Sequence, residues 1–240
     1  MERFFNTTVN QQEVSKEEVK SFFASVYSYM FLGLMVTGMV SWYLASSGLF
    51  LEWFVNPATG GMSPLFYVVV FSPLAFVFLI QAKYQSFSTS TLIALFVVFS
   101  MLMGASLSSI FFVYTMSNIA TTFFVTAGGF GAMAILGYTT SIDLSKMGSL
   151  LYMAFIGIFL AGIVNMFMQS EAMGYWISFI GVFVFTGLTA WEMQKLKAIA
   201  HEASVLPEEK KKMSILGGLT LYILFVNLFL SLLRLLGSRD

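Results

Sequence analysis

Seven long, uninterrupted runs of apolar residues constrain this chain more than any other feature. A helix needs about 20 apolar residues to cross the hydrocarbon core of a bilayer. The runs cover residues 22–46, 64–82, 89–113, 118–138, 149–168, 174–192 and 214–236. They are continuous rather than alternating, which favours helices over the strands of a barrel. The sequence therefore predicts an all-α, polytopic membrane protein with seven transmembrane helices.

The composition fits a surface that is solvated by lipid. Hydrophobic residues make up 58% of the chain and charged residues only 10%, whereas a soluble domain carries about 25% charged residues. The formal net charge is +0, so the chain lacks the basic excess that nucleic acid requires, and we expect no nucleic-acid partner. The absence of cysteine and the single histidine, His201, exclude disulfides, thiolate metal sites and paired-histidine zinc sites. We expect no cofactor.

The connections between the runs are too short to hold a second domain. We expect a cytoplasmic N-terminal segment at 1–21, one transmembrane domain at 22–236 and a C-terminal tail at 237–240. Ser15 and Glu18 match a capping box, which predicts a helix that leads into the first run. The longest connection, residues 193–213, is charged, and we expect only a short helical turn in it, starting at Pro207.

Basic residues are distributed unequally between the two sides of this predicted bundle. One side carries Arg3, Lys16, Lys20, Lys83, Lys146, Lys195, Lys197, Lys210, Lys211 and Lys212, and the other carries Arg234 and Arg239. Because cytoplasmic loops are enriched in Lys and Arg, the asymmetry predicts a cytoplasmic N-terminus and a C-terminus on the opposite side. The short termini suit a bacterial inner (plasma) membrane.

Glycines recur within several runs, most densely at Gly128, Gly129, Gly131 and Gly137. Small residues let helix backbones approach closely in lipid, where association depends on packing. Close structural packing is the favoured interpretation. A flexible or pore-lining element is the alternative.

Glu192 is the acidic residue that falls within a run, at its cytoplasmic end. Acidic groups at membrane depth are costly and usually functional. Shielding from water disfavours the charged form of a carboxyl group, so Glu192 could change protonation state in a useful pH range. Lys83 is the expected cationic partner and candidate latch. The alternative is an interfacial glutamate that reaches water beside Lys195.

The remaining polar residues of the runs do not indicate catalysis. Asn165 and Asn227 could hydrogen-bond between helices or line a polar path, and we favour packing. Arg234 is expected to extend to the lipid headgroups. The segment His201-Glu202-Ala203-Ser204-Val205 begins like a zinc-protease motif but lacks the second histidine. We therefore expect that the chain is not an enzyme.

Three stretches resemble the Bax inhibitor-one family, also called the transmembrane Bax inhibitor motif family, and are similar to its bacterial-type members. They are residues 123–146 (FFVTAGGFGAMAILGYTTSIDLSK), 185–197 (FTGLTAWEMQKLK) and 221–237 (LYILFVNLFLSLLRLLG). The resemblance implies six helices around a central C-terminal helix. It also implies a pH-sensitive calcium leak channel of the plasma membrane or endoplasmic reticulum, linked to stress tolerance and suppression of cell death.

The family's gate is described as two aspartates, one ending the sixth helix and one early in the seventh, latched by a basic residue of the second. The first aspartate matches Glu192, the second matches Leu224, and the latch matches Lys83 loosely. Leu224 cannot ionise, so a shared-proton pair is lost and a one-site titration of Glu192 is expected.

Two functions therefore stay open. The favoured one is a calcium or cation leak channel with Glu192 as its pH sensor and calcium as the transported ion. The alternative is a non-conducting membrane regulator that binds another membrane protein, such as a quality-control protease.

Overall fold

The computed structural model describes residues 15–202 and 204–237, and its secondary structure follows the apolar runs of the sequence. The helices are α1 (Lys16–Ser46), α2 (Leu49–Phe54), α3 (Pro64–Lys83), α4 (Thr89–Leu107), the 3-10 helix η1 (Ser108–Phe112), α5 (Met116–Thr139), α6 (Ser145–Met168), α7 (Glu171–His201) and α8 (Pro207–Leu236). The single β-bridge found among these residues joins Val55 to Met62 in the connection between α2 and α3.

Seven helical segments of the described chain are long and apolar enough to cross a membrane, which confirms the predicted fold class. They are α1, α3, α4 together with η1, α5, α6, α7 and α8. The predicted capping box is also present: the backbone N–H of Glu18 donates to Ser15 Oγ at 3.2 Å, and that of Ser15 donates to Glu18 Oε2 at 3.3 Å.

The prediction of a long loop at 193–213 is wrong. Helix α7 continues to His201, and α8 already begins at Pro207. The segment after Glu192 contains strong helix formers such as Met, Gln, Lys, Leu and Ala. Leu196 and Ala200 also bury their side chains in the bundle, so packing extends the helix by more than two turns beyond the apolar run.

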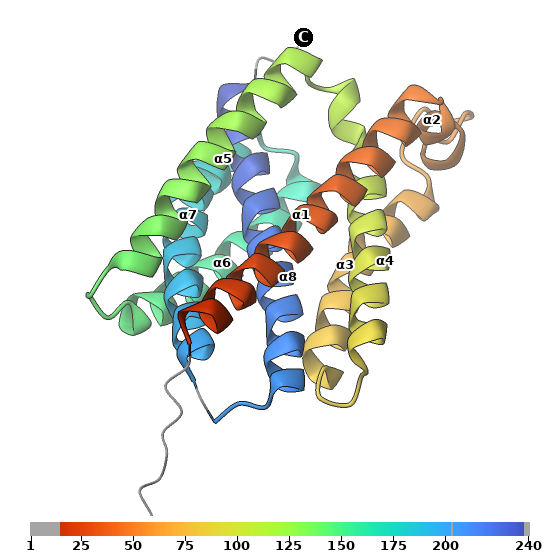
Figure 1. Cartoon of the computed structure of the whole chain (residues 1–240). Helices are drawn as coiled ribbons and strands as arrows, with labels where there is room; N and C mark the ends of the chain where they lie inside the picture. Colours follow the sequence, from red (N-terminus) through yellow and green to blue (C-terminus); the bar gives the residue numbers. More distant parts are fainter. Residues whose placement is uncertain (1–14, 203, 238–240) are drawn as a thin grey trace, which may run out of the picture.

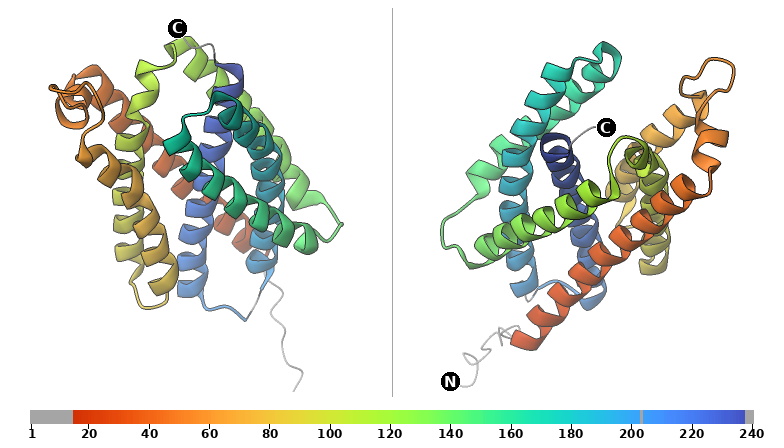
Figure 2. Two further views of the ribbon diagram at one scale, coloured as in Figure 1. Left: turned by 180° about the vertical axis from the view of Figure 1, so that it is seen from behind. Right: turned by 90° about the horizontal axis from the view of Figure 1, so that it is seen from above.

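Helix α8 forms the axis of the bundle. It packs against α1, α4, α5 and α7, whereas α3 packs chiefly on α4 and α6 chiefly on α7 (Figures 1 and 2). Of the most apolar stretch of α8, 67% is buried, against 0% of the corresponding stretch of α6. The outer faces of the other helices are left to lipid.

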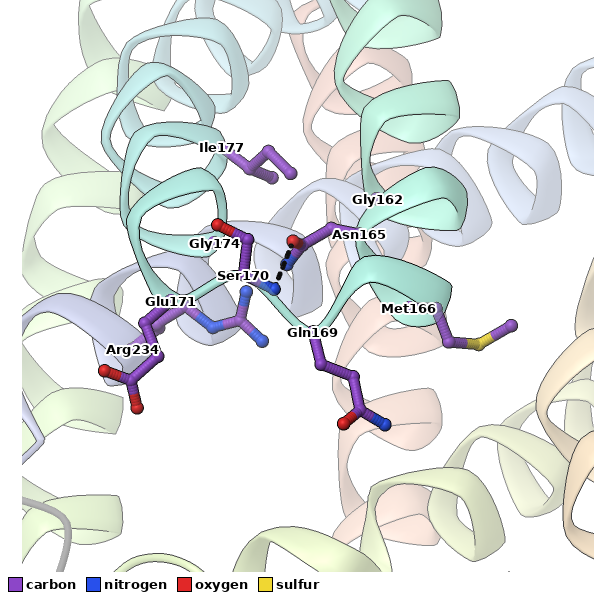
Figure 3. A pocket seen from close by; sticks show the side chains of 9 residues that line it. All are labelled: Gly162, Asn165, Met166, Gln169, Ser170, Glu171, Gly174, Ile177 and Arg234. Atoms are coloured by element: carbon purple, nitrogen blue, oxygen red, sulfur yellow. Dashed lines mark hydrogen bonds between the residues drawn. The ribbon is translucent and has the colours of Figure 1, made fainter.

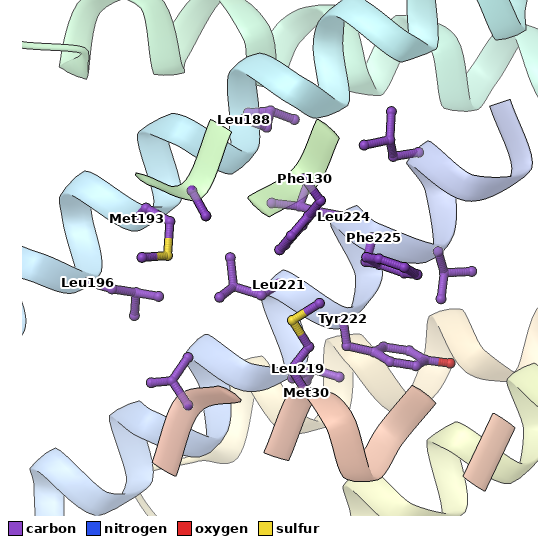
Figure 4. Close-up of a cluster of buried hydrophobic side chains, with 14 of the residues drawn as sticks. Met30, Phe130, Leu188, Met193, Leu196, Leu219, Leu221, Tyr222, Leu224 and Phe225 are labelled. Atoms are coloured by element: carbon purple, nitrogen blue, oxygen red, sulfur yellow. The ribbon is translucent and has the colours of Figure 1, made fainter. Parts of the chain in front are cut away.

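The core around α8 combines apolar packing with one buried hydroxyl link. Side chains from α1, α5 and α7 converge on the Leu219–Phe225 segment of α8 (Figure 4). The hydroxyl groups of Thr37 and Tyr222 lie 2.7 Å apart, and Thr37 Oγ1 donates to the carbonyl oxygen of Ser100 at 2.9 Å. These bonds connect α1, α4 and α8 in a region where no water is available as a substitute partner.

The glycines of α5 divide into two groups. A Cβ at Gly137 would overlap the backbone carbonyl group of Ala190 on α7, so this position requires glycine. A Cβ at Gly128, Gly129 or Gly131 would meet nothing within 4 Å. The packing interpretation therefore holds for Gly137 and is wrong for the other three, because they face away from the neighbouring helices.

Replacing Gly137 with alanine should destabilise the bundle by about 1–3 kcal/mol, because the new methyl group must push the α5 and α7 backbones apart. The matched control is Gly128→Ala in the same helix, which should be neutral or slightly stabilising because its methyl group enters open space. Thermal unfolding followed by circular dichroism in detergent measures both. Equal unfolding midpoints for the two variants would contradict the close α5–α7 contact.

Candidate functional site

Glu192 lies in the interior of α7 and is buried, with 3% of its surface exposed. Its carboxylate forms an ion pair with Lys195 of the same helix, at 3.4 Å from Nζ to Oε2 and 3.5 Å from Nζ to Oε1. The Lys195 side chain is 51% exposed, and its Nζ lies 5.6 Å from the centre of the Trp191 ring. The pair therefore links a carboxylate inside the bundle to an amine that reaches the bundle surface.

The expected pair between Glu192 and Lys83 is not formed. Lys83 is exposed at the C-terminal end of α3, which packs chiefly on α4. Helices α1 and α8 lie between α3 and α7, so the two charged residues belong to opposite parts of the bundle (Figure 1). The correction is that Lys195, one turn along α7, supplies the positive charge.

The part of α7 that follows Glu192 is fixed to the end of α5 and to the connection between α5 and α6. Gln194 Oε1 accepts a hydrogen bond from the backbone N–H of Leu144 at 2.9 Å, and its Nε2 donates to the carbonyl oxygen of Ile142 at 2.8 Å. Lys197 Nζ donates to the carbonyl oxygen of Tyr138 at 2.8 Å. A change in the position of this part of α7 would therefore be transmitted to the α5–α6 connection.

Trp191 adds a packing contact to the same attachment. Its indole ring lies against Gly148 near the start of α6, where a Cβ would overlap the ring. The sequence alone did not indicate these contacts of Gln194, Lys197 or Gly148. All but Gly148 lie within residues 185–197, one of the stretches that carry the family resemblance.

Asp143, in the connection between α5 and α6, is not a suitable pH switch. Hydrogen bonds from the side chain and the backbone of Ser145 hold the pKa of this exposed carboxyl group below its ordinary value. A group of this kind stays ionised throughout the neutral and mildly acidic range. Glu192 is therefore the better candidate for an ionisable sensor.

Leu224 lies in an apolar part of the core, 7% exposed on α8 (Figure 4). Phe130 of α5 and Leu188 of α7 belong to the same cluster of buried side chains. At the position that matches the family's second aspartate, this chain therefore has an apolar side chain that packs in the core.

The two asparagines do not join this site. Asn227 Nδ2 donates to the carbonyl oxygen of Ile223 at 2.8 Å, within its own helix. Asn165 Oδ1 accepts from the backbone N–H of Ser170 at 3.1 Å, in the turn between α6 and α7. Both amides therefore make local bonds to the backbone, and the structure does not bring them together with Glu192.

Comparison with known proteins agrees with the fold and with the three sequence stretches. A family model described as "Inhibitor of apoptosis-promoting Bax1" matches residues 19–240. The inner membrane protein YbhL of Escherichia coli (strain K12) is 44% identical over 223 residues, which cover 92% of this chain and 93% of that protein.

More distant relatives match over similar lengths. An uncharacterized protein of Borreliella burgdorferi is 38% identical over 227 residues, covering 93% of this chain and 96% of the relative. An uncharacterized protein of Rickettsia prowazekii is 36% identical over 233 residues, covering 97% of this chain and 96% of the relative. With its seven apolar helices and a family match over nearly its whole length, this chain belongs to the Bax inhibitor-one family of integral membrane proteins.

Proposed function

We propose that this chain is a pH-sensitive leak channel for calcium or related cations in the bacterial inner membrane, with Glu192 as its ionisable sensor. The observation that carries the proposal is the burial of the Glu192 carboxylate inside a transmembrane helix. An acidic group in such a position is costly and is retained mainly for function. Family membership supports the channel, because residues 185–197 resemble a stretch of the family and Glu192 matches the first aspartate of the gate that the resemblance implies.

In this proposal the ion pair between Glu192 and Lys195 is the switch. Protonation of Glu192 removes the attraction that holds the Lys195 ammonium group, which lies 3.4 Å away. The turn of α7 that contains both residues is also bonded to the α5–α6 connection through Gln194. A shift of α7 upon protonation would then alter the packing of α5 and α6 against it.

We also propose how the protein is oriented in the membrane and what it interacts with. The N-terminus is cytoplasmic, and the basic residues near the ends of α3 and α7 face the cytoplasm. The lipid bilayer and the transported cation are its partners, with no bound cofactor and no enzymatic reaction. Among residues 15–202 and 204–237 no group of three or more His, Cys, Asp or Glu residues is placed to hold a metal ion. In this proposal the cation is the transported ion.

The orientation can be tested with single cysteines, because the chain contains none of its own. Ser86→Cys lies in the exposed connection between α3 and α4, and Ala58→Cys lies in the exposed connection between α2 and α3. An impermeant maleimide added to intact spheroplasts should label Ala58→Cys and should leave Ser86→Cys unlabelled until the membrane is permeabilised. The reverse pattern would show that the N-terminus is outside.

An alternative function is favoured by Leu224. Leu224 is buried at the position that matches the family's second aspartate, and a leucine there would weaken an ion site while the fold is kept. Under this alternative, the chain is a non-conducting regulator that binds another membrane protein, for example a quality-control protease. A stable partner should then co-purify from native membranes.

Calcium flux into liposomes that contain the purified protein distinguishes the two functions. Wild-type flux should exceed that of empty liposomes and should vary with pH as a single titration. Glu192→Gln should lower it by about tenfold, the factor that corresponds to a loss of roughly 1.4 kcal/mol of electrostatic attraction, and should remove the pH dependence.

Two further variants sharpen this measurement. Glu209→Gln removes an exposed carboxylate near the start of α8 and should leave flux unchanged. Leu224→Asp should raise flux if the pathway still exists, once circular dichroism shows that the variant is folded. Wild-type flux equal to that of empty liposomes at every pH, with no gain in Leu224→Asp, would reject the channel.

A further inference from the structure

A second polar site lies at the end of the bundle opposite to Glu192. It is a cavity of about 400 Å³ between the end of α6, the start of α7 and the end of α8. Gly162, Asn165 and Met166 of α6, Gly174 and Ile177 of α7, and Arg234 of α8 line it (Figure 3). Three helices thus contribute to one open site near the ends of apolar, membrane-length helices.

Arg234 brings an unpaired positive charge to this cavity. Its guanidinium group has five N–H donors and forms no hydrogen bond or ion pair with any residue in the described part of the chain. Instead it lies over α7, where Nη1 is 2.8 Å from the point that a Cβ of Gly174 would occupy. The side chain therefore lies across the neighbouring helix, beside Gly174.

The amide of Asn165 points to the same place. Its orientation is fixed because Oδ1 accepts the backbone N–H of Ser170, which leaves Nδ2 as a donor without a partner in residues 15–202 and 204–237. Nδ2 lies 3.3 Å from the Cβ point of Gly174 that Arg234 also approaches. Two sets of unused donors, one of them charged, converge on one position.

The chemistry of the ligand follows from these donors. Converging N–H groups with a guanidinium require an acceptor that carries negative charge, and a guanidinium matches the oxygens of phosphate with two parallel hydrogen bonds. Met166 and Ile177 add an apolar wall. The cavity also adjoins α6, whose most apolar stretch has no buried residues and faces lipid.

Glu171 is the other charged residue that lines the cavity. In Figure 3 its carboxylate is directed away from the Asn165 amide, on the far side of the guanidinium.

We propose that this cavity binds a phosphate-type oxyanion between Arg234 and Asn165. Two sources carry this chemistry: the headgroup of a phospholipid, with its chains along α6 and α7, and free inorganic phosphate. The site is separate from Glu192, and its existence does not depend on ion flux.

The chain offers a matched pair of substitutions for the test. A Cβ at either Gly162 or Gly157 of α6 would meet nothing within 4 Å. A new side chain at either position therefore begins in open space. Gly162 lines the cavity and Gly157 does not. Gly162→Phe should therefore fill the site, while Gly157→Phe places the same side chain on the same helix outside it. Arg234→Gln removes the charge without filling the cavity.

Native mass spectrometry of the delipidated, purified protein measures the binding of short-chain phosphatidylglycerol, of diacylglycerol with the same chains, and of inorganic phosphate. Wild type and Gly157→Phe should retain one phospholipid, and Gly162→Phe and Arg234→Gln should bind it at least about tenfold more weakly, since a charge-assisted hydrogen bond is lost. Diacylglycerol should not bind, because it has no phosphate.

Each further outcome decides the proposal. Retention of inorganic phosphate with the same dependence on Gly162 and Arg234, but no retention of phospholipid, supports the oxyanion site and assigns a soluble source. Phospholipid bound equally by all four proteins, diacylglycerol bound as well as phospholipid, or no binding of either phosphate compound overturns it. Circular dichroism spectra show whether the variants keep the wild-type fold.

Discussion

The lack of water inside a bilayer is the constraint on which this structure depends. Backbone polar groups must be satisfied within each helix, and the helices must then hold together without a difference in hydrophobicity between protein and lipid. The chain meets this requirement by surrounding α8, which packs against four other helices. Close backbone contact at Gly137 and the buried link between Thr37 and Tyr222 add to that packing. Helices α3 and α6 remain largely open to lipid.

Glu192 is a charged residue buried in this mostly apolar bundle, and a buried charge requires a partner of opposite charge. Its carboxylate is nearly inaccessible to solvent, yet its counter-ion Lys195 is half-exposed. The pair lies on the part of α7 that is bonded to the α5–α6 connection and packed against Gly148. A change of charge at one buried oxygen would therefore act on three helices, which is the physical basis for proposing the sensor at this position.

The sequence predicted features that depend on long stretches and missed those that depend on single contacts. Seven apolar runs and the Ser15–Glu18 pattern were sufficient for the spans and the first helix start. The extension of α7 past Glu192 was missed because it carries charged residues on one face and is buried through only a few side chains, those of Met193, Leu196 and Ala200. Nothing in the sequence could show that Gly137 packs while Gly128 faces outward, or that Lys195 replaces Lys83. These facts depend on helix rotation and on which helices are neighbours.

The central claim is that the buried Glu192 carboxyl group changes protonation state. Infrared difference spectroscopy of the purified protein in bilayers, recorded as the pH is lowered, observes this directly. We expect a protonated-carboxyl band that grows with a single midpoint in the wild type and is missing from Glu192→Gln. Identical difference spectra for the two proteins would contradict it.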